Sequence, residues 1–263
     1  MPEQTFGGDD TGGQVEEKKK LGGLSKFGLT PDSNIRDVFW RIMASYSATK
    51  KPGIDLKELE PDRFALMNAA ISVLKSPHIR DYGLSPRFIV NYTITMMLEG
   101  GWEDAFTEFL VKSHEGKEEL QKNVALALRK QLESEQHSEW LRQYFKALLR
   151  QSSMNPMALR FIAGIDDIGL VASLKQELLI IARGDIGQNQ LDAIAAIAAL
   201  KDDNEVKRSL IIILSHWDVE ARKAAAEALK AFKKDPDVRE AAARRLVSET
   251  DPEIKKILKT VAK

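Results

Sequence analysis

A charged phrase recurs near the C-terminal end of the chain at an almost constant spacing. An aspartate is followed four residues later by a cation, as Asp203/Lys207, Asp218/Arg222, Asp235/Arg239 and Asp251/Lys255. The cation steps by 15, 17 and 16 residues, which is the length of one helix and one turn. Two such periods make a helical hairpin of roughly 30–40 residues, the unit of an α-solenoid. The sequence therefore predicts an all-α protein built from stacked helix pairs.

Prolines mark the expected helix starts. Six prolines directly follow a residue that can cap a helix: Thr30-Pro31, Ser76-Pro77, Ser85-Pro86, Asn155-Pro156, Asp235-Pro236 and Asp251-Pro252. Proline suits the first helical position because its missing N–H would be unpaired there in any case. We predict helices at about 32–48, 61–76, 86–99, 101–113, 116–135, 137–151, 156–164, 168–183, 188–200, 204–215, 218–232, 236–248 and 251–262.

One segment carries a conflicting signal. Residues 87–95 are rich in β-branched and aromatic side chains and could form a strand by propensity alone. The Ser85-Pro86 pair before them and Gly100-Gly101 after them are typical of a helix start and a helix end. We therefore predict a helix here.

The chain divides into three parts by composition. Residues 1–30 are punctuated by glycine pairs and carry a dense charge run, so we expect a flexible tail. Residues 31–152 hold three of the four tryptophans and longer helices, whereas residues 153–263 are alanine-rich with a shorter period. The tail also contains Leu21, Leu24, Phe27 and Leu29. These four residues either rest on the first helices or form a docking segment for another protein.

The composition excludes several classes of protein. Lysine plus arginine and aspartate plus glutamate both number 39, so the basic excess typical of a nucleic-acid binder is absent. Cysteine is absent, which rules out disulfides and thiolate chemistry and fits a reducing cytoplasm. No apolar run approaches the ~20 residues of a membrane span. We expect a cytoplasmic protein that does not enter the membrane.

The search for reaction chemistry finds no workable cluster. The four histidines form no metal-ligand spacing, and the phosphate-loop and nucleophile-elbow patterns are missing. Asp166-Asp167 is better explained as a helix cap than as a catalytic pair. The four tryptophans are expected in the core or wedged between helices, because tryptophan is highly buried on average. We predict no catalytic residue, no metal and no cofactor.

The repeated phrases resemble HEAT repeats. Asp218, Ala221, Arg222, Ala225, Ala228 and Leu229 fit that pattern closely, and Asp237, Val238, Arg239, Ala242 and Leu246 fit it more loosely. The resemblance covers residues 188–263 and extends less clearly to 153. It implies a structural ladder between neighbouring repeats made by Asp218, Arg222, Asp237 and Arg239. Lys207 and Lys255 depart from the pattern, and lysine cannot form arginine's planar fork.

The resemblance is to a class of scaffolds and fixes no single function. The leading hypothesis is a non-enzymatic scaffold or adaptor that presents its helical surface to another protein. Two alternatives stay open: a nucleic-acid-binding HEAT-like protein, with DNA repair as one example, and a HEAT-like lyase that attaches bilin chromophores. A continuous basic groove would favour the first alternative and a deep apolar pocket the second. A mixed apolar and polar ridge would favour a protein partner.

Overall fold

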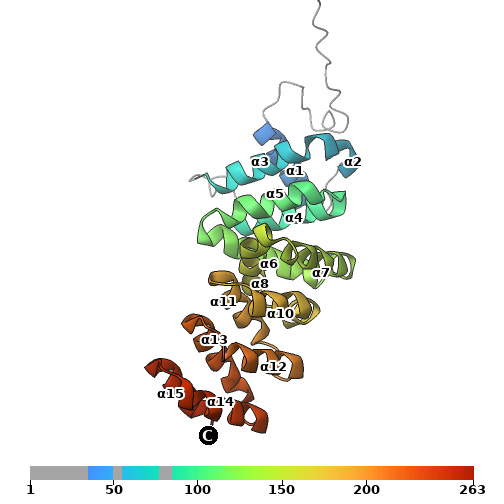
Figure 1. Ribbon diagram of the computed structural model, residues 1–263. Coiled ribbons are helices and arrows are strands. Elements are labelled where there is room, and N and C mark those ends of the chain that lie inside the picture. Colours follow the sequence, from blue (N-terminus) through green and yellow to red (C-terminus); the bar gives the residue numbers. More distant parts are fainter. Residues whose placement is uncertain (1–34, 50–54, 77–84) are drawn as a thin grey trace, which may run out of the picture.

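The computed structural model describes residues 35–49, 55–76 and 85–263. About 82 % of these residues are helical, and no strand occurs among them, so the predicted all-α fold is confirmed. Figure 1 shows an elongated stack that runs from α1 at one end to α15 at the other. Within the described ranges, no helix combines the length and the apolar character needed to cross a membrane.

Most of the helices form two rows, which we call A and B. Row A holds α3 (Arg63–Leu74), α5 (Glu103–His114), α7 (Glu135–Leu149), α10 (Lys175–Gly184), α12 (Asn204–Ile213) and α14 (Pro236–Ser248). Row B holds α4 (Pro86–Gly100), α6 (Glu118–Leu132), α8 (Asn155–Ile165), α11 (Gln188–Ile197), α13 (Val219–Leu229) and α15 (Pro252–Val261). Each row B helix packs against the next one in its row, and each row A helix pairs with the row B helix that follows it in the chain.

Shorter or terminal elements complete the stack. The helix α1 (Ile35–Thr49) packs on α3 at the first end, and α2 (Leu56–Leu59) contacts α4. The six-residue α9 (Ile168–Ser173) joins α8 to α10. The described residues also form the 3₁₀ turns η2 (Glu60–Asp62), η4 (Ser152–Met154) and η5 (Lys230–Phe232).

One apolar core runs through the whole stack. The buried side chains form a single cluster that extends from Val38 in α1 to Val261 in α15. The boundary expected between residues 152 and 153 lies in η4, inside the hairpin of α7 and α8. Both rows therefore continue across it, through α6 to α8 and α7 to α10. Leu229 is fully buried together with Ala221 and Ala225, which share its face of α13.

The caps explain where most helices begin and end. The side chain of Ser85 accepts from the N–H of Phe88 at 3.2 Å, and Asp235 and Asp251 cap α14 and α15 in the same way. Gly101 closes α4 with a φ of 68°, a conformation that favours glycine. The conflicting segment at 87–95 is therefore helical.

Two expectations about helix boundaries were wrong, and one short helix was not predicted. Asn155 does not cap α8, because it is the first helical residue and its buried side chain makes no capping bond. The helix expected at 168–183 is two helices, because it breaks at the buried Leu174. The short helix α2 was not predicted from the sequence. Pro31 and Pro77 lie outside the described residues.

Candidate interaction surface

The turn between α12 and α13 exposes a tryptophan. Trp217 is 75 % exposed, although tryptophan is usually among the more buried residues. The expectation that Trp217 lies in the core or between helices is therefore wrong, whereas Trp102 is buried as expected. Trp140 lies at the surface of α7 and stacks on Tyr144, with ring centroids 5.0 Å apart.

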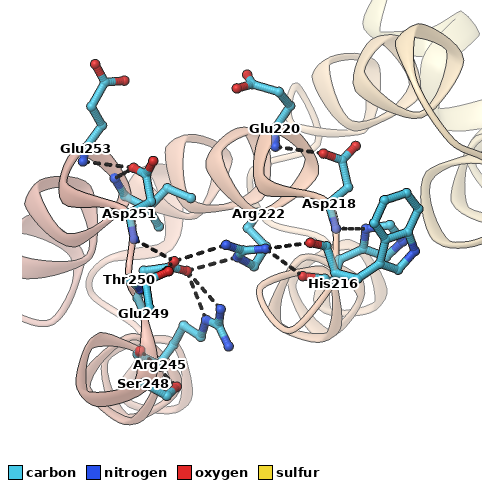
Figure 2. Close-up of polar contacts among 12 residues, drawn as sticks. His216, Asp218, Glu220, Arg222, Arg245, Ser248, Glu249, Thr250, Asp251 and Glu253 are labelled. Carbon is cyan, nitrogen blue, oxygen red and sulfur yellow. Dashed lines mark hydrogen bonds and ion pairs between the residues drawn. The ribbon is translucent and has the colours of Figure 1, made fainter.

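Arg222 holds the backbone beneath Trp217. Its Nη1 donates to the carbonyl oxygens of His216 at 3.0 Å and Trp217 at 2.9 Å. Its Nε and Nη2 donate to the two carboxylate oxygens of Glu249, at 2.9 and 3.0 Å. Figure 2 shows this fork reaching from α13 to the end of α14. The turn that carries Trp217 is thus tied to the next helix pair.

Glu249 is the centre of this clamp. It is only 2 % exposed and also accepts from Arg245 and from the backbone N–H groups of Thr250 and Asp251. The bonds from Arg222 hold the pKa of Glu249 far below its usual range, and they raise the pKa of Arg222. A buried carboxylate with two arginines and two backbone donors is well satisfied, so the clamp fixes the geometry of the turn.

His216 restrains the other side of the turn. Its Nδ1 accepts from the N–H of Asp218 at 3.2 Å, which places the proton of the neutral ring on Nε2. Its ring lies 5.3 Å from that of Trp217, centroid to centroid. Because the backbone around Trp217 is already held, a partner that covers the indole has little ordering cost to offset.

Other apolar side chains share the edge that carries Trp217. We define the loop edge as the turns from row A to row B at residues 185–187, 214–218 and 249–251, with the adjacent helix ends. Beyond residue 155, six of the seven exposed large apolar residues lie on it; these are Ile180, Ile186, Ile212, Trp217, Val219 and Val247. The seventh, Ile168, starts α9 on the opposite edge. Apolar exposure in this part of the stack is concentrated on one side.

Acidic groups accompany this apolar set. Asp185, Asp218, Glu220 and Asp251 lie on the loop edge, and none of them forms an ion pair with a cation of the described chain within 4.0 Å. Glu253 is paired with Lys223. Arg183, Lys255 and Lys256 at the adjacent helix ends also form no ion pair with a described residue within 4.0 Å, so the edge offers a partner charges of both signs, with the carboxylates of Asp218 and Glu220 next to Trp217.

The residues expected to form a ladder do not all meet. Arg222 bonds to Glu249 and not to Asp237, and Asp218 caps α13 by accepting from the N–H of Glu220. Asp237 lies 3.9 Å from Lys207, and Arg239 is exposed with no ion pair among the described residues. Lys207 is nearly buried and bonds to Asp235 at 2.5 Å.

The interactions between successive helix pairs follow a longer period than the 16-residue phrase. Lys175 donates to Asp203 at 2.9 Å, and the equivalent bond from Lys207 to Asp235 also spans 28 residues. Lys207 therefore lies one complete helix pair after Lys175, and Asp235 lies one complete helix pair after Asp203. The 32-residue spacing of Lys175 and Lys207 is the sequence signal that could have located these pairs.

Other predicted features fall elsewhere. Leu21, Leu24, Phe27 and Leu29 lie outside the described residues. Asp167 caps α9 by accepting from the N–H of Leu170 at 2.6 Å, as expected. In the described part of the chain, no three acidic or histidine side chains converge as metal ligands.

Several hollows lie between neighbouring helices of the described residues, and one of about 640 Å³ is lined by Lys75, Glu115, Lys117 and Glu119 beside apolar side chains. One of about 520 Å³ between α6 and α8 is lined by Glu118, Lys122 and Arg160 beside apolar side chains. One of about 470 Å³ between α7 and α10 contains Glu177, which Arg150 pairs at 2.8 Å. Each hollow carries charges of both signs.

Comparison with known proteins adds little to this geometry. No family model matches the chain, and no curated protein matches it. Among solved structures, the chain is similar to the crystal structure of an engineered protein, with 16 % identity and a TM-score of 0.38. That match covers 85 % of this chain and 94 % of the other.

Proposed function

We propose that this chain is a HEAT-like scaffold or adaptor that binds another protein through the loop edge. The observation that carries the proposal is Trp217, an exposed indole on a turn that Arg222 and His216 hold rigid. Tryptophan is enriched among the residues that dominate binding energy at protein interfaces. The neighbouring isoleucines and valines extend the surface, and Asp218 and Glu220, which form no ion pair with another described residue within 4.0 Å, follow Trp217 directly in the chain.

The mixed character of this edge favours a protein partner over the two alternatives. A nucleic-acid site needs a continuous run of cations, whereas the loop edge and the hollow between α6 and α8 both carry charges of both signs. A chromophore lyase needs a deep apolar pocket that encloses a tetrapyrrole, whereas the hollows between the helices carry charges of both signs. An apolar ridge with polar surroundings is instead typical of an interface between proteins.

The test is affinity capture from the native cell followed by mass spectrometry. The edge variant carries Trp217→Ala and Ile186→Ser, and the control variant carries Ile168→Ser. Ile186 and Ile168 are both 63 % exposed but lie on opposite edges, so they form a matched pair. The edge variant should lose proteins that the wild type and the control retain. Equal retention by all three would contradict the proposal.

A further inference from the structure

We propose that the loop edge receives residues 18–29 of a second copy of this chain. This inference rests on the proposed function, because it uses the same surface and names one occupant for it. Residues 18–29 lie outside the described residues. Their side-chain chemistry and the distance that they can span from α1 identify them as the occupant.

The chemistry of the segment complements that of the edge. Its sequence is KKKLGGLSKFGL, which combines four lysines with Leu21, Leu24, Phe27 and Leu29. The edge offers Trp217 and exposed aliphatic side chains to the apolar residues, and free carboxylates to the lysines. A lysine ammonium can also lie over the face of an exposed indole. An apolar and basic segment therefore meets an apolar surface that has the carboxylates of Asp218 and Glu220 next to Trp217.

The short reach of Phe27 makes its contact with the turn of Trp217 intermolecular. Phe27 lies eight residues before the start of α1, so it can extend at most about 28 Å from Ile35. The stack from α1 through α3, α5, α7 and α10 to α12 involves five helix-to-helix steps, of which the step from α5 to α7 is made by the ring contact of Phe106 with Tyr144. At about 8–10 Å a step, these steps separate α1 from the turn of Trp217 by roughly 40–50 Å. Figure 1 shows α1 and α12 towards opposite ends of the molecule.

The geometry also indicates how copies combine. A segment at one end of the stack that binds near the other end gives a contact between two different surfaces. Each copy supplies one segment and one edge, so a copy that lacks one of them can still use the other. This asymmetry separates the proposal from a symmetric contact between two loop edges.

The experiment is a complementation test with full-length chains. The tail variant carries Leu24→Ser and Phe27→Ser and keeps an intact edge. The edge variant carries Trp217→Ala and Ile186→Ser and keeps an intact tail. Sedimentation velocity over a concentration series should show that the wild type self-associates and that each variant alone does so about tenfold more weakly. An equimolar mixture of the two variants should form a heterodimer.

The controls keep the result interpretable. Circular dichroism and the thermal midpoint should match the wild type for the edge variant, since Trp217 and Ile186 are exposed, and the tail variant is compared in the same way. The Ile168→Ser variant should associate as the wild type does. Added salt should weaken the association, because it screens the lysine–carboxylate attraction.

Three outcomes would overturn the inference: a monomeric wild type, a mixture that fails to form the heterodimer, and self-association that survives the edge substitutions. If one of these occurs while the edge variant still loses cellular partners in the capture experiment, the proposed function stands without this occupant. If the capture experiment also shows no loss, both are wrong. If the mixture of the two variants forms a heterodimer and neither variant associates with itself, the result supports the inference and the loop edge as a binding surface.

Discussion

Removal of the Glu249 carboxylate should destabilise the C-terminal end of the stack strongly. The side chain of Glu249 is fully buried and accepts six hydrogen bonds, four of them from Arg222 and Arg245. In Glu249→Ala, the nearly buried Arg222 loses its counter-charge and keeps only the carbonyls of His216 and Trp217. Breaking a buried ion pair from one side costs about 3–5 kcal/mol. Glu249→Gln retains an acceptor and should cost less, about 1.5–3 kcal/mol.

Urea unfolding followed by circular dichroism measures this loss. Glu253→Gln is the matched control, because it removes an exposed carboxylate that pairs with Lys223. An exposed pair contributes about 0–1 kcal/mol, so this control should unfold nearly as the wild type does. A loss below about 1 kcal/mol for Glu249→Ala would show that the clamp does not hold the last two helix pairs together.

Three further predictions follow from buried contacts. Leu229→Ala should cost about 2–5 kcal/mol in urea unfolding, because Leu229 is fully buried; a change within about ±0.5 kcal/mol would contradict its placement. Gly164→Val should lower the thermal midpoint, since even a Cβ at Gly164 would lie 3.0 Å from that of Ala125; an unchanged midpoint would mean that α6 and α8 can separate freely. The pKa of Glu249 is depressed on folding, so its contribution is complete above the unfolded value of about 4.3 and is lost as the pH falls towards the folded pKa. The stability difference between the wild type and Glu249→Gln should therefore shrink below about pH 4.3, and a constant difference would refute this.

Local sequence signals located most of the helices. A capping side chain before proline is a short-range signal, and Ser85, Asp235 and Asp251 act as the sequence predicted. The same rule failed at Asn155, where the preceding 3₁₀ turn already leads into the helix. Capping preferences do not predict such a 3₁₀ turn, because the turn depends on how the chain leaves the previous helix.

The contacts between helix pairs were harder to predict. The phrase pattern located Arg222, but its partner Glu249 lies outside every phrase, at the end of α14. Which carboxylate meets an arginine depends on how successive pairs stack, and the 16-residue period does not contain that information. The exposure of Trp217 was missed because the prediction used the average burial of tryptophan, which cannot show that a particular turn points outward.

The account's central claim is that the loop edge contacts another protein chain. Site-specific photocrosslinking in the native cell tests this most directly, with a benzophenone amino acid at position 217 or, as the control, at position 168. Both positions are exposed, but they lie on opposite edges of the stack. We expect discrete crosslinked adducts from position 217 and none of the same size from position 168. The claim would be contradicted if position 217 gave no adduct, or if both positions gave the same set.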